Sequence, residues 1–158
     1  MDVVYNGIKL DVTAIGPNVF YGCKPLTYAN LGSVTKVDTK AFARCAYLRT
    51  VDAVDSLSTV SSYAFFKCTR LVDFCMDDSL KSMAVFGSYA FCDDSKLGGI
   101  AVPSFMKTVS ANAFSVPFID EGGAALDTTA ESLAGYRYAS IDGTFVRQLW
   151  VAAGTELS

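Results

Sequence analysis

The sequence contains no histidine, no long apolar run and no run of basic residues. Without histidine the commonest general base is missing, which excludes Ser–His and Cys–His catalysis and most zinc enzymes. No apolar stretch approaches the ~18–20 residues that a membrane-spanning helix needs. Because the net charge is −3, nucleic acid and anionic membrane surfaces are poor candidate partners. We therefore expect a chain that is not an enzyme, binds no cofactor and does not span or bind a membrane.

The first residues of the chain do not resemble a secretory signal. Met1-Asp2-Val3-Val4 has neither the charged nor the apolar region of a secretory signal. As written, the chain is expected in the cytoplasm, whereas an upstream extension would allow an extracellular or surface location. Its 158 residues correspond to a single domain, and half of them are apolar without forming long runs.

The apolar residues follow a repeat with intervals of 22, 23, 26 and 23 residues between successive phenylalanines, which are Phe20, Phe42, Phe65, Phe91 and Phe114. Four of the five follow an alanine, three precede a cysteine by three residues, and four precede a leucine by six. A period of 20–29 residues that keeps so many columns within one chain is typical of a stacked solenoid. One coil cannot bury its own apolar residues, so we expect the coils to cover one another and their phenylalanines to stack inward.

Two more columns precede each phenylalanine, and another follows it. The aliphatic residues five and eight positions earlier are well matched except in the fourth unit, where an insertion is predicted around Val85, Phe86 and Gly87. The column nine residues after each phenylalanine is Ala29, Val51, Phe74 and Ile100. Alternation around this column predicts short strands with one buried face. Residues between the buried ones should face outward, and the Ala-Phe pair should lie in a 3₁₀ turn or a single helical turn.

This pattern closely resembles the BspA-like family of leucine-rich repeats, in which coils carry the run Ile-Gly-x-x-Ala-Phe-x-x-Cys-x-x-Leu. The best matches are residues 15–23, 37–45 and 60–68, and the resemblance covers about residues 12–120. It implies a parallel-stranded, arc-shaped solenoid of about five coils that is used for protein binding or adhesion. It implies no catalytic residues.

The two ends of the chain lie outside the repeat. Residues 1–11 contain Asn6-Gly7 between short apolar segments, which predicts a hairpin with a type I′ turn that covers the first coil. Residues 121–158 are predicted to form a C-terminal cap or a degenerate sixth coil. Thr128-Thr129-Ala130-Glu131 fits a capping box for a helix through Leu133, and a turn at Asp142-Gly143 precedes a strand at 145–151. The predicted organisation is one domain with a repeat array at 12–120.

The outward strand face is the predicted binding surface. Solenoids bind partners on extended surfaces of this kind, and tyrosine is enriched at protein interfaces. The partner is expected to be a protein or peptide of unknown identity, and the chain is expected to be a monomer. A solvated strand face of any solenoid would also carry polar residues, so both interpretations stay open here. The candidate surface comprises Tyr28, Asn30, Thr50, Asp52, Asp73 and Cys75, with Phe86 on the predicted insertion as a second contact.

The five cysteines suggest further alternatives. Cys23, Cys45 and Cys68 share one column that points into the core, so we expect free buried thiols. A disulfide framework and a metal site are the alternatives, although five cysteines leave one over and a linear column is a poor tetrahedral site. Cys75 is predicted to face outward, which makes it the most reactive thiol and a candidate redox sensor.

Aspartates near the third and fourth coils provide the alternative function. Clustered carboxylate oxygens could bind calcium, although no twelve-residue calcium-loop pattern is present. A calcium-dependent binding module would use Asp73, Asp77, Asp78, Asp93 and Asp94. Solvated loop acids are the simpler interpretation of the same residues.

Overall fold

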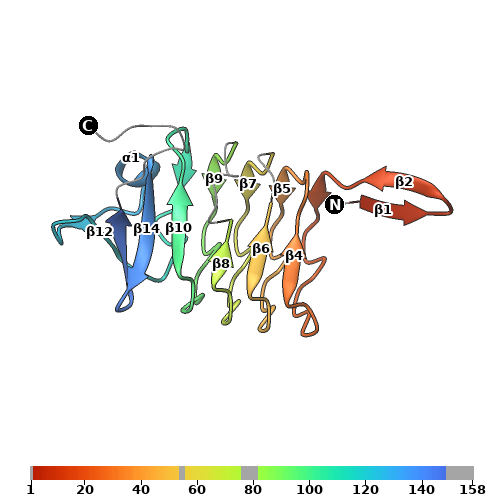
Figure 1. The fold of residues 1–158 in the computed structure, drawn as a ribbon, viewed down its shortest axis with the longest axis horizontal. Helices are drawn as coiled ribbons and strands as arrows, with labels where there is room; N and C mark the ends of the chain where they lie inside the picture. The colour runs from red at the N-terminus through yellow and green to blue at the C-terminus, as the bar shows by residue number, and fades with distance from the viewer. Residues whose placement is uncertain (1, 54–55, 76–81, 149–158) are drawn as a thin grey trace.

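The computed structural model describes residues 2–53, 56–75 and 82–148. These residues form an elongated stack of coils, each of which adds short strands to parallel ladders (Figure 1). One ladder contains β3 (Ala14–Ile15), β5 (Lys36–Val37), β7 (Thr59–Val60), β9 (Val85–Phe86) and β11 (Thr108–Val109). The other contains β4 (Tyr28–Asn30), β6 (Thr50–Asp52) and β8 (Asp73–Phe74). The leucine-rich-repeat solenoid predicted from the sequence is confirmed.

The repeated phenylalanines form a continuous stack through the core. Ring centroids of successive members lie 5.1, 5.2, 5.6 and 5.1 Å apart along the order Phe20, Phe42, Phe65, Phe91 and Phe114. The rings of the last four are almost parallel, with interplanar angles of 3–7°. Each ring buries roughly 150–250 Å², so this stack supplies a large part of the apolar area that holds the coils together.

The segment around each phenylalanine forms a third ladder without regular strands. In the first coil the backbone N–H groups of Asn18, Phe20 and Gly22 donate to carbonyls of the second coil at 2.8–3.1 Å. The same pattern continues from the second coil to the third and from the third to the fourth. Alternate residues instead close i→i−3 turns, such as the Ala41 N–H to the Asp38 carbonyl at 3.1 Å. The backbone of the turns is thereby satisfied between coils as well as within them.

The insertion predicted around Val85 and Phe86 is wrong, and with it the prediction of Phe86 as an exposed contact. Val85 and Phe86 form β9, which pairs in parallel with β7 and β11 and places Phe86 beside Val60 and Val109. Phe86 is therefore fully buried, five residues before Phe91 like its equivalents in the other coils. The extra residues of this coil lie between Phe74 and Met83, mostly outside the described residues. Because Phe86 is aromatic where the other coils have an aliphatic residue, the aliphatic pattern did not reveal its register.

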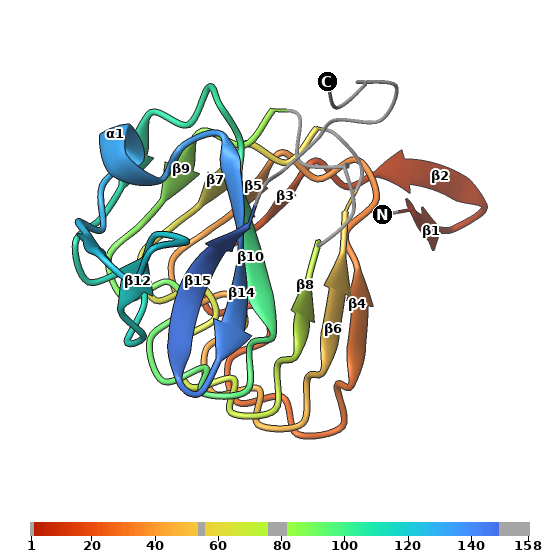
Figure 2. The same cartoon turned by 60° about the vertical axis from the view of Figure 1, so that its left-hand side comes forward.

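The C-terminal residues build a five-stranded sheet against the last coils (Figure 2). Its order is β10 (Gly99–Val102), β14 (Tyr136–Ile141), β15 (Thr144–Gln148), β12 (Phe118–Ile119) and β13 (Ala125–Leu126). The helix α1 (Ala130–Leu133) has Thr129 as its N-cap, whose side chain accepts from the Ser132 N–H. Asp142 and Gly143 both have positive φ in the β14–β15 turn. Residues 149–151 of the predicted last strand lie outside the described residues.

Aromatic residues of this sheet close the end of the ring stack. Phe118 and Phe145 meet the last stacked ring, Phe114, edge-to-face at 5.3 and 5.8 Å. Tyr138 packs against Phe118 and donates its hydroxyl to the Leu133 carbonyl at 2.9 Å. Burial raises the pKa of Tyr138 to about 12, which keeps this phenol in the donating form. The role of residues 121–158 as a cap stays a prediction, and these contacts support it.

The N-terminal hairpin consists of β1 (Asp2–Tyr5) and β2 (Ile8–Asp11), which pair antiparallel through a turn with positive φ at Asn6 and Gly7. Neither strand pairs with any other described strand. Figure 1 shows the hairpin extending away from the first coil, although the Asn6-Gly7 pattern led us to expect a hairpin that covers that coil. Its role as a cap stays a prediction. Within the described residues, the fold contains no helix of the length and apolarity required to cross a bilayer.

The corrected register generates a prediction at Gly87. A Cβ atom there would lie 2.7 Å from the Ser62 nitrogen and 2.8 Å from the Ser61 carbonyl carbon, both of which belong to the rigid ladder. We expect Gly87→Ala to lower the free energy of unfolding by about 1–3 kcal/mol through overpacking. Gly16→Ala is the matched control from the same column, because its Cβ would meet only Val19 Cγ2 at 3.5 Å. Urea denaturation followed by circular dichroism compares the two, and equal losses would contradict the register.

Candidate functional site

The outward face of β4, β6 and β8 brings together five of the seven predicted surface residues. Strand pairing places Tyr28 beside Thr50 and Thr50 beside Asp73, while Asn30 lies beside Asp52. Between them, Ala29, Val51 and Phe74 point inward and are buried. The alternation therefore arises because each strand has one face on the ring stack and the other in solvent. We call the surface formed by Tyr28, Asn30, Thr50, Asp52 and Asp73 the strand-face surface.

A hydrogen bond orders the exposed edge of this surface. The Tyr28 hydroxyl donates to Asp52 Oδ2 at 2.7 Å across neighbouring coils, and 50% of Tyr28 remains exposed. This hydrogen bond, helped by the Asp52 charge, raises the pKa of Tyr28. Asn30 Oδ1 accepts from the Gly32 N–H at 3.0 Å, which positions its side chain at the end of β4. The surface thus presents a tyrosine ring and carboxylates from a backbone that the ladder holds in place.

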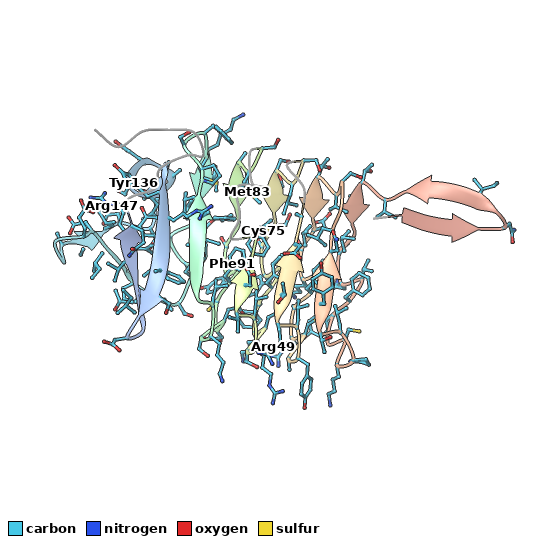
Figure 3. The ribbon with its side chains drawn as sticks, in the orientation of Figure 1. Arg49, Cys75, Met83, Phe91, Tyr136 and Arg147 are labelled. Carbon is cyan, nitrogen blue, oxygen red and sulfur yellow. The ribbon has the colours of Figure 1, made fainter. Side chains whose placement is uncertain are left out.

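Cys75 does not belong to this surface, so the prediction that it faces outward is wrong. β8 ends at Phe74, and Cys75 has a φ of 47°, so the alternation of inward and outward side chains does not extend to Cys75. Its side chain is only 2% exposed, and its N–H donates to the Val51 carbonyl at 3.0 Å. Figure 3 labels Cys75 at the end of β8, above Phe91. A redox sensor at Cys75 is therefore unsupported, because reagents reach exposed thiols.

The strand-face surface ends at β10. Gly99 and Ala101, which were expected to face outward, are both buried. Here β14 pairs antiparallel with β10 and places Arg137 beside Ala101. The open part of the face is therefore limited to β4, β6 and β8.

The cysteine column contributes internal hydrogen bonds. Cys45 and Cys68 are free and buried, while Cys23 is free and half-buried. The Cys45 thiol donates to the Phe20 carbonyl at 3.0 Å, and the Cys68 thiol donates to the Phe42 carbonyl at 3.1 Å. Burial raises the pKa of Cys45 to about 11 and that of Cys68 further still. These thiols therefore act as small apolar groups that also satisfy a carbonyl of the preceding coil.

In the fourth coil Asp94 occupies the cysteine column, and its side chain is buried with 3% exposed. Its Oδ1 accepts from the Cys68 N–H at 2.8 Å, whereas Oδ2 has no hydrogen-bond partner. Burial, together with the charge of Asp93, raises the pKa of Asp94 well above its usual value against the opposing effect of the Cys68 N–H. Unlike the thiols of Cys45 and Cys68, the Asp94 carboxyl group makes no hydrogen bond to a carbonyl of the preceding coil.

The aspartates proposed for calcium are not gathered into one site. Asp73 lies on the strand face, Asp93 is exposed on a turn, and Asp94 is buried in the core. Asp77 and Asp78 lie outside the described residues. The described part of the chain holds no group of three or more acidic or thiol side chains that could bind a metal ion. Calcium dependence stays a prediction that no contact supports.

The residues on either side of each phenylalanine were not among the predicted surface residues. In the second and third coils they are cationic or aromatic. The residues two before and two after the phenylalanine are Lys40 and Arg44 in one coil and Tyr63 and Lys67 in the next. Their recurrence at equivalent positions was the signal that could have identified a second surface.

Comparison with known protein families identifies the repeat. The family model for the BspA type leucine-rich repeat region matches residues 8–118 in six copies. Among solved structures, the chain is similar to a leucine-rich repeat protein from Bacteroides ovatus, with 17% identity and a TM-score of 0.35. That match covers 78% of this chain and 41% of the other, so the chain spans less than half of that protein's length. No curated protein matches the chain.

The position of Asp94 predicts a pH dependence. Below about pH 4 Asp94 is protonated in both the folded and the unfolded chain, so its burial does not lower the free energy of unfolding there. As the pH rises, the unfolded chain loses its proton first, and the free energy of unfolding falls until the raised pKa is passed. We expect Asp94→Asn to remove this fall and to stabilise the protein at pH 8. Urea denaturation at pH 5 and pH 8 measures both effects, and Asp127→Asn, which removes an exposed carboxyl group outside the repeat, is the control that should keep the fall.

The burial of the thiols predicts their order of alkylation. In native protein at pH 8, iodoacetamide should modify the half-buried Cys23 and Cys92 while Cys45, Cys68 and Cys75 stay protected. Mass spectrometry of digested protein identifies the modified residues, with a urea-denatured sample as the control in which all five react. Rapid modification of Cys75 in the native protein would contradict its placement in the core.

Proposed function

Because the chain belongs to the BspA-type leucine-rich repeat family, we propose that it is a non-catalytic module that binds a protein or peptide on the strand-face surface. The family typically consists of binding scaffolds, which points to protein interaction or adhesion. The observation that carries the choice of surface is the in-register alignment of the exposed Tyr28 with the half-buried Thr50 and Asp73 on three adjacent parallel strands.

The physical properties of this surface suit recognition. The three strands are fixed by ladders on both sides of the coil, so binding would lose little backbone entropy. Tyr28 offers a large ring with two rotatable bonds, and its hydroxyl is already oriented by Asp52. Asp52 and Asp73 give the surface a negative charge, which would favour a partner segment that carries lysine or arginine. An extended partner peptide could then contact several coils at once.

Selection from random peptides tests the proposal, because it requires no identified partner. A phage-displayed library of random dodecapeptides is selected on immobilised protein, and the affinities of enriched peptides are measured by isothermal titration calorimetry. We expect Tyr28→Ala and Asp52→Ala to weaken these peptides at least about tenfold, as interface tyrosines and charge partners do. The peptides should also be enriched in basic residues.

The matched control lies on the other ladder. Lys36→Ala and Thr108→Ala alter exposed side chains of β5 and β11 without touching the strand-face surface. These variants should bind the enriched peptides as the wild type does. Peptides that respond to the β5 and β11 variants but not to Tyr28→Ala would place binding elsewhere and refute the proposed surface.

A further inference from the structure

The turns that carry the ring stack form a second surface, opposite in charge to the strand-face surface. Its centre is a half-open hollow of about 280 Å³ between the first three coils. We call it the turn-face hollow, and its lining consists of Tyr21, Lys40, Ala43, Arg44, Tyr63 and Phe66. Two cations and three aromatic rings line it, and no carboxylate does. An anionic group would therefore meet attraction and no repulsion from the lining.

Aromatic contacts hold the walls of the hollow in place. Tyr63 stacks on Tyr89 at 4.9 Å and meets the edge of Phe66 at 5.2 Å. Lys40 Nζ lies 5.7 Å from the centre of the Tyr63 ring. No ion pair joins Lys40 or Arg44 to another side chain within residues 2–53, 56–75 and 82–148. The Lys40 charge therefore lies over an aromatic ring, and no carboxylate of these residues neutralises either cation.

The backbone conformation at Lys40 and Arg44 is unfavourable for these residue types. The turn ladder requires positive φ two residues before and two after the phenylalanine in each of the first four coils. The first coil places Asn18 and Gly22 there, and these residue types tolerate that conformation well. The second coil instead places Lys40 and Arg44 there, with φ of 58° and 60°. The equivalent residues of the third and fourth coils share this conformation, with φ of 56–63°, so it belongs to the repeat and gives no advantage to the cations of the second coil.

We propose that the turn-face hollow binds an acidic peptide segment of a partner protein. Carboxylates of the segment would pair with Arg44, whose planar guanidinium suits bidentate contact, and with Lys40. The rings of Tyr21 and Phe66 would pack against the apolar parts of the same segment, as tyrosine does in interfaces. Tyr21 is 48% exposed and therefore accessible for this contact. This site is separate from the strand-face surface and does not depend on it.

The test uses a fluorescein-labelled decapeptide of glutamate, measured by fluorescence anisotropy on the full chain in 25 mM salt. The decisive variant is Lys40→Asn combined with Arg44→Gly, which installs the residue types of the first coil at both positions. We expect it to bind the peptide at least about tenfold more weakly, because both charges are lost from a weakly screened site. Its melting temperature should stay the same or rise, because both replacements relieve the positive-φ strain.

Three controls make the result decisive. Lys96→Gln combined with Lys107→Gln removes the same net charge from exposed positions outside the hollow and should leave binding unchanged. Tyr21→Ser should weaken binding with no change in charge, and a decapeptide of glutamine should not bind. The proposal is overturned if the wild type fails to bind the glutamate peptide, or if both double variants lose affinity equally. Binding of a sulfated polysaccharide without binding of the glutamate peptide also overturns it.

Discussion

Every coil of this protein depends on the next one to bury its phenylalanine. A single coil of 22–26 residues has too little interior to shield an aromatic ring, whereas stacked coils share one continuous column of rings about 5 Å apart. The same spacing is close to the distance between hydrogen-bonded strands, so ring stacking and backbone pairing favour one geometry. Because ring stacking and backbone pairing favour the same spacing between coils, very short strands are enough to hold the coils together.

At the end of the stack, no further coil follows to cover the last ring, Phe114. The chain departs from the repeat after Phe114, and Phe118 and Phe145 cover that ring edge-on. Tyr138 packs in turn against Phe118. Arg147 pairs with Glu121 at 2.7 Å and lies over Tyr136, so the added strands are also fastened at their outer side (Figure 3). An array that stopped without such residues would leave an open edge for another chain.

Stacking also explains why surfaces can diverge while the core repeats. Inward columns meet the same neighbours in every coil, so phenylalanine, alanine and leucine recur. Outward positions meet only solvent and side chains, which leaves them free to become acidic on the strand face and cationic or aromatic on the turns. Two surfaces of opposite sign on one rigid backbone would allow the module to contact two different partners. At the turn positions the fold imposes a positive φ on every one of the first four coils, and only the first coil has Asn and Gly there.

Sequence spacing alone was enough to predict the repeat period, the ring stack, the strand alternation around Ala29 and Val51, and the turns at Asn6-Gly7 and Asp142-Gly143. Each of these follows from local spacing or from the φ preference of a residue. Packing between coils, in contrast, places Phe86 in the inward column, turns Cys75 into the core and buries Asp94 at the position of a thiol. The physical reason is that these outcomes depend on which atoms of the neighbouring coil a side chain meets, and sequence spacing does not contain those contacts.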